Sequence, residues 1–113
     1  MTRVNTGYSL MAGIEVNSEK IRTALPGIEQ EVHPAAVFYK APVRRYDPKQ
    51  GGHDIEITKQ RHGRIAVIHI VGSNRGRRAA LDSVLSMLGA TEIDVAYAEE
   101  RVNRALMREN YPR

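Results

Sequence analysis

The stretch Arg64–Val71 is the most apolar run of this chain and is rich in β-branched residues. Both faces that it would present as a strand are apolar, which is typical of a central strand rather than an edge strand. Gly72, Ser73 and Asn74 follow with turn-forming chemistry, and either Ser73 or Asn74 can cap a helix. The sequence therefore predicts a strand, a tight turn and a helix in succession.

The predicted helix has one apolar stripe and a basic start. Leucine and valine recur at positions 81, 84, 85 and 88, the spacing of one helical face, and Gly89 is a typical end. Arg75, Arg77 and Arg78 occupy the expected first turn, where the helix dipole disfavours cations by about 0.3–1 kcal/mol each. A bound anion would remove this conflict, so the Gly72–Arg78 turn is a candidate phosphate site. The alternative is an ordinary connection with solvated arginines.

Alternating apolar and polar residues predict further strands over residues 4–16, 36–43 and 54–60. The tight turn Arg61–Gly63 predicts that the last of these pairs antiparallel with the central strand. Asn17 or Ser18 is expected to cap a short helix before Pro26, with a brief extended segment over residues 28–32. Residues 91–113 fit either a short strand followed by a helix over residues 99–109 or one continuous helix.

This order of elements predicts a single α+β domain over residues 1–113, an antiparallel β-sheet with helices packed on one face. The chain has no cysteine, which excludes disulfides and thiolate chemistry. No run approaches the roughly 18–20 apolar residues of a membrane span, and the first residues lack the apolar core of a signal peptide. We expect a cytoplasmic protein that does not associate with membranes.

Two segments resemble one repeat of the TATA-binding protein (helix-grip) fold. Glu19–Phe38 resembles the short helix, the Leu-Pro pair and the proline before a strand, and Arg61–Leu88 resembles the turn, strand, turn and long amphipathic helix. The phenylalanines with which that family wedges apart base steps are absent, since His33 precedes Pro34 and the turn near Gln60 has no phenylalanine. Family members carry two repeats and this chain has room for one. The resemblance implies a DNA-binding half-saddle that would need to dimerise.

Basic residues are concentrated in the middle of the chain. More than half of the 17 lysines and arginines lie between Lys40 and Arg78, and the net charge is +4. Arginine forks fit phosphates bidentately, so we predict a nucleic-acid-binding module for DNA or RNA that needs no cofactor and is not an enzyme. The residues expected to contact phosphates from loops, a hairpin tip and a helix start are Arg44, Arg45, Lys59, Arg61, Arg64, Arg75, Arg77 and Arg78.

Two other functions fit the same residues. The first is a protein–protein interaction module, or a homo-oligomeric assembly such as a homodimer, without nucleic acid. The second is an enzyme or sensor for a small phosphorylated ligand at the Gly72–Arg78 turn.

Histidines and aromatic residues give weaker signals. His33, His53, His62 and His69 lack the spacing of metal ligands, and His53 has no nucleophile beside it, so neither a metal site nor a catalytic residue is predicted. His69 is expected to be a hydrogen-bonded core residue. Aromatic rings among basic residues can stack on exposed bases, and the residues in question are Tyr8, Phe38, Tyr39 and Tyr46. Phe38 is expected in the core, whereas Tyr39 and Tyr46 fit either role.

Overall fold

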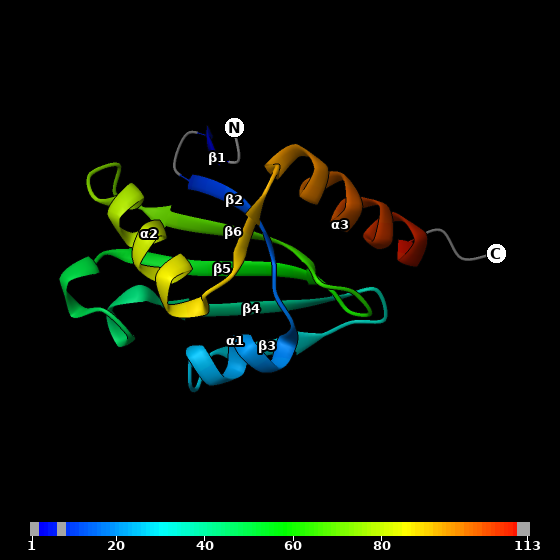
Figure 1. Cartoon of the computed structure of the whole chain (residues 1–113), viewed down its shortest axis with the longest axis horizontal. Coiled ribbons are helices and arrows are strands. Elements are labelled where there is room, and N and C mark those ends of the chain that lie inside the picture. The colour runs from blue at the N-terminus through cyan, green and yellow to red at the C-terminus, as the bar shows by residue number, and fades with distance from the viewer. Residues whose placement is uncertain (1–2, 7–8, 111–113) are drawn as a thin grey trace.

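The computed structural model describes the backbone of residues 3–6 and 9–110 and the side chains of residues 9–108. It shows one antiparallel sheet with three α-helices (Figure 1). The strands are β1 (Arg3–Thr6), β2 (Ser9–Glu15), β3 (Glu29–Val32), β4 (Ala36–Pro42), β5 (His53–Gln60), β6 (Ile65–Gly72) and β7 (Thr91–Ile93). The helices are α1 (Ser18–Ala24), α2 (Arg77–Leu88) and α3 (Val95–Asn110), and two short 3-10 helices, η1 (Val43–Arg45) and η2 (Pro48–Gln50), lie between β4 and β5.

The strand order is β1-β2-β6-β5-β4-β3, so β6 is internal as predicted, with β2 on one side and β5 on the other. The predicted β5–β6 hairpin is confirmed, and its register pairs His53 with Gly72 at one end and Lys59 with Ala66 at the other. Asn17 caps α1 as expected, since its side chain accepts a hydrogen bond from the Lys20 amide at 2.7 Å.

The N-terminal segment corrects the sequence prediction. Residues 4–16 do not form one strand, because β1 folds back on β2 and pairs antiparallel with it, Arg3 opposite Ala12 and Thr6 opposite Ser9. Alternation with a period of two fits one long strand and two paired strands equally well. β7 pairs with the rest of β2, residues 13–15, and so continues the same edge. Tyr8 lies outside the described residues.

The main core lies between the sheet and the two helices α1 and α2, which pack on one face as predicted (Figure 1). Ile55, Ile57, Ile68 and Ile70 point into this core from the central strands, against Ile21, Leu25, Leu81, Val84 and Leu88 from the helices. Tyr39 is fully buried here. Phe38, one residue earlier on β4, is only half-buried and lies edge-on to His33, which corrects the expectation that Phe38 is a core residue.

α3 covers part of the opposite face, which we call the second face, and this corrects the prediction that the helices pack on one face of the sheet. Val95, Ala98 and Val102 of α3 pack on Met11, Ile65 and Val67 of β2 and β6. The C-terminal stretch is therefore a short strand followed by a helix, and this helix begins at Val95, earlier than expected. The α+β class with an antiparallel sheet is confirmed. Among the described helices, none has the length and apolar character needed to cross a bilayer.

Candidate nucleic-acid interface

The predicted phosphate-binding residues fall into two groups at opposite ends of the β5–β6 hairpin. Lys59, Arg61 and Arg64 lie at its turn. The other group lies where the hairpin opens, on η1 and at the start of α2, and comprises Arg44, Arg45, Arg75, Arg77 and Arg78. β5 is eight residues long, so the two groups are separated by roughly 25 Å at about 3.3 Å per residue. The structure therefore does not bring them together into one basic surface.

Two of these cations are buried. Lys59 is 3% exposed, and its Nζ donates hydrogen bonds to the Gln60 carbonyl oxygen at 2.7 Å and to that of Gly63. Arg77 is 4% exposed and donates to the Asn74 side chain. Both are engaged within the protein, where they hold turns, rather than displayed on its surface. The others, including Arg61, Arg64, Arg75 and Arg78, are exposed.

The burial of Lys59 makes the free energy of unfolding depend on pH. Desolvation, and then the positive charge of Arg64, lower the pKa of the Lys59 ammonium below 10.5. The unfolded chain then binds this proton more tightly than the folded chain, so the contribution of Lys59 to the free energy of unfolding rises with pH up to about 10.5. We expect the wild type to gain stability relative to Lys59→Met as the pH rises toward 10.5, and urea titrations at increasing pH measure this gain. Parallel stability profiles of the two proteins would contradict this account.

The Gly72–Arg78 turn differs from the prediction. α2 begins at Arg77, and its N-cap is Gly76 in the left-handed region (φ 86°), with no side-chain cap from Ser73 or Asn74. The His53 ring lies inside the turn, where its Nε2 is 3.2 Å from the Ser73 carbonyl oxygen and 3.1 Å from that of Arg75. Carbonyl oxygens only accept hydrogen bonds and do not attract anions. The inside of this turn is therefore unsuited to a phosphate.

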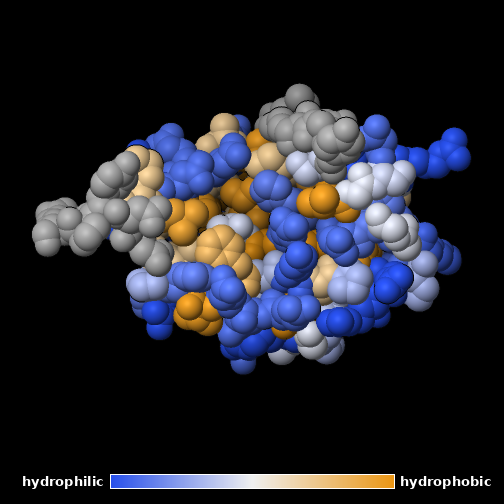
Figure 2. Space-filling view, turned by 180° about the vertical axis from the view of Figure 1, so that it is seen from behind, coloured by the Kyte–Doolittle hydropathy of each residue, from blue (hydrophilic) through white to orange (hydrophobic). Residues whose placement is uncertain are grey.

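A groove on the second face lies between α3 and the sheet, beside the β5–β6 turn. One part has a volume of about 430 Å³ and is lined by Gln60, Tyr97, Glu100, Arg101, Arg104, Ala105 and Arg108. A second part of about 380 Å³ shares Gln60, Ala105 and Arg108 and extends to His62 and the Pro34–Ala35 turn. Figure 2 shows this face of the molecule, where hydrophobic surface gathers in the middle and hydrophilic residues surround it.

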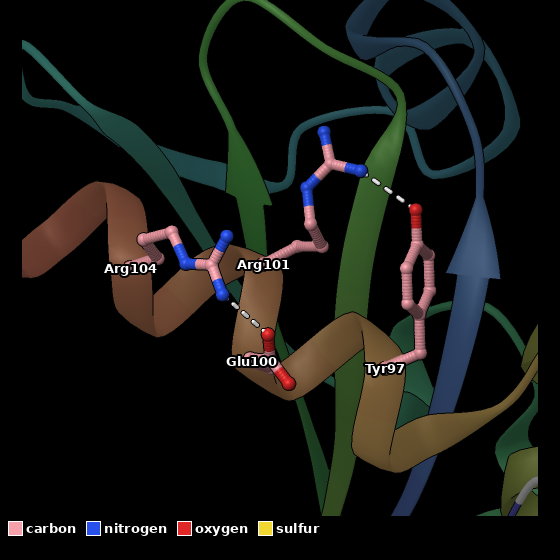
Figure 3. A network of polar contacts seen from close by, with 4 residues as sticks. All are labelled: Tyr97, Glu100, Arg101 and Arg104. Atoms are coloured by element: carbon pink, nitrogen blue, oxygen red, sulfur yellow. Dashed lines mark hydrogen bonds and ion pairs between the residues drawn. The ribbon is translucent and has the colours of Figure 1, made fainter.

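The positive charge of this groove comes from α3, where Arg101, Arg104 and Arg108 lie on one side of the helix. Arg61 and Arg64 are exposed on the neighbouring turn, but neither is among the residues that line the groove. Arg64 instead lines a separate hollow beside Asn17 and Leu88. Glu100 opposes this charge and forms an ion pair with Arg104 at 2.5 Å (Figure 3). Both side chains of the pair are well exposed, so their attraction is weak and a phosphate can compete for the guanidinium.

The α3 arginines are absent from the predicted site. Cations in the later turns of a helix are explained by the helix dipole alone, so their presence there predicts no ligand. The available signal was their spacing at residues 101, 104 and 108, which places them on one helix side. That side acquires a partner only because α3 crosses the second face and reaches Gln60.

Comparisons of the chain with models of known protein families, with curated proteins and with solved structures found no match. The resemblance to one repeat of the TATA-binding protein fold accordingly stays a prediction. Within the part of the chain that the structure describes, no group of three or more histidine, aspartate or glutamate side chains could hold a metal ion.

Proposed function

We propose that this protein binds nucleic acid through the groove between α3 and the β5–β6 turn and that it acts by binding alone. The observation that supports this most directly is the row of three arginines on the side of α3 that lines the groove, Arg101, Arg104 and Arg108. The hairpin turn, distant from α3 in sequence, contributes Gln60 and His62 to the same groove. Planar guanidinium groups pair bidentately with phosphate oxygens, which suits a row of them to a polyanionic backbone.

This proposal moves the centre of the interface away from the start of α2. Of the residues predicted from the sequence, Arg61 and Arg64 are exposed on the turn that borders the groove, and neither lines it. Lys59 supports the turn from inside. Arg44, Arg45, Arg75 and Arg78 form a separate basic region at the far end of the hairpin and provide a natural comparison.

Binding of this kind depends strongly on salt. Each phosphate contact releases counterions, so three contacts should cost roughly 20–40-fold in affinity between about 50 and 200 mM salt. Because Arg104 and Arg108 line the groove, Arg104→Ala/Arg108→Ala should weaken binding by roughly tenfold or more and reduce the salt dependence. Fluorescence anisotropy with labelled single-stranded DNA, single-stranded RNA and duplex DNA measures both effects.

The matched control is Arg75→Ala/Arg78→Ala, which removes the same charge at the other end of the hairpin and should change affinity by no more than about threefold. Glu100→Gln removes the opposing charge and should tighten binding slightly. Equal losses in the two double variants would mean that only net charge matters, and a loss confined to the control would place the anchor at the start of α2. Either result, or no binding to any oligonucleotide at low salt, would overturn the proposal.

A further inference from the structure

Tyr97 stands at one end of the groove with its ring in solvent. It is 48% exposed, and among the described residues Val32, Tyr97 and Met107 are the large apolar side chains left exposed. Tyr97 lies in the first turn of α3, where its amide donates to the Asp94 side chain at 3.0 Å. Its ring is therefore carried by a capped helix start rather than by a loop.

The Tyr97 ring is also held by the side chain of Arg101. Nη1 of Arg101 donates to the Tyr97 hydroxyl at 2.6 Å, and the guanidinium carbon lies 5.6 Å from the ring centroid (Figure 3). A contact between two residues one helical turn apart on an exposed surface adds little to stability. Its main effect is to preset the orientation of the ring, which lowers the entropy that a ligand must remove when it orders the side chain.

The same side of α3 then presents cations at regular distances from the ring. Arg104 and Arg108 lie seven and eleven residues beyond Tyr97, or about 10 and 16 Å further along the helix axis at 1.5 Å per residue. An aromatic face followed by guanidinium groups matches a ligand that carries both a flat π-system and spaced phosphates. Unpaired nucleotides expose the faces of their bases for stacking, whereas a duplex buries them and offers mainly phosphates and groove edges.

We infer that the groove takes a single-stranded polynucleotide, with one base stacked on Tyr97 and the following phosphates on Arg104 and Arg108. This inference rests on the proposed function and adds the class of strand and the residue that contacts a base. Stacking on an aromatic ring tolerates every base, so the preference should be for single strands and not for a sequence.

The test compares three labelled ligands of equal length: a single strand, the same backbone with abasic sites, and a duplex. Tyr97→Leu should lower affinity for the single strand by roughly 5–140-fold, which is the range that base stacking on an aromatic residue contributes. Tyr97→Phe keeps the ring and should stay within about threefold of the wild type. Neither variant should change affinity for the abasic strand. Single-stranded DNA and RNA serve as separate arms.

A second variant reports the contact directly. The chain has no tryptophan, so Tyr97→Trp introduces its only one, which can be excited apart from the tyrosines. The emission of this tryptophan should be quenched by the base-bearing strand and not by the abasic one. Unchanged single-strand affinity in Tyr97→Leu, or equal wild-type affinity for duplex and single strand, would overturn the inference. If Arg104→Ala/Arg108→Ala still weakens binding in that case, the phosphate-binding groove stands and only the stacking role fails.

Discussion

Replacing Gly72 with alanine should lower the free energy of unfolding by about 3 kcal/mol or more. Gly72 ends β6 with φ at 140°, a backbone conformation that residues with a side chain rarely adopt. A Cβ at this position would lie 2.3 Å from the Gly52 carbonyl oxygen and 3.1 Å from the Cα of His53. Both neighbours are backbone atoms of the Gly52–His53 segment, which lies opposite Gly72, so no change of side-chain rotamer relieves the overlap.

The measurement is the midpoint of thermal and urea unfolding, and the melting temperature should fall by roughly 10 °C or more. Gly51→Ala is the control, because Gly51 has φ at −59° and an added Cβ there would be 3.8 Å from its nearest neighbour. It should change stability by less than about 0.5 kcal/mol. If Gly72→Ala were as stable as the control, β6 and the Gly52–His53 segment would not approach each other this closely.

Gly13→Ala should loosen the helix that carries the groove. A Cβ on Gly13 would lie 2.8 Å from the Cβ of Ala98 and 2.9 Å from the Asp94 carbonyl oxygen, so α3 would have to move away from β2. Overpacking of this kind costs about 1–3 kcal/mol. Because Tyr97 and the groove arginines belong to α3, we expect the variant to lose both stability and affinity for oligonucleotides.

Amide hydrogen exchange gives the site-resolved measurement for Gly13→Ala. Protection should fall along α3 more than along α2, which packs on the other face. Gly51→Ala again serves as the control and should leave both the exchange pattern and the affinity unchanged. Wild-type protection of α3 together with wild-type binding would contradict the close packing of this helix on Gly13.

The position of the groove depends on where α3 packs, and not on where basic residues are densest along the chain. The phosphate-binding residues predicted between Arg44 and Arg78 are close in sequence, yet the β5–β6 hairpin separates them into two groups at its opposite ends. Two of them, Lys59 and Arg77, are buried. The arginines of α3 are far from the turn in sequence and near it in space. Of the candidate site, only the β5–β6 turn that borders the groove could be predicted, and not the arginines of α3 that line it.

The local elements were determined by the sequence itself. The strand at Ile65–Gly72, its hairpin with β5, the apolar stripe of α2 and the Asn17 cap all follow from residues within a few positions of one another. Side-chain periodicity, turn chemistry and capping act over these short separations, so they are visible in the linear pattern.

The tertiary structure decided which of two equivalent arrangements each pattern adopts. Alternation on β4 offers Tyr39 and Phe38 to opposite faces, and only the packing of α1 and α2 makes the Tyr39 face the interior. The same alternation allows one strand or two over residues 4–16. In the structure, β2 pairs with β6 on one side and with β1 on the other, so the segment forms two strands. α3 lies on the second face because Met11 and Val67 offer it an apolar surface there, and Gly13 lets the helix approach β2 closely. Contacts between distant segments select among these alternatives, and they created the groove.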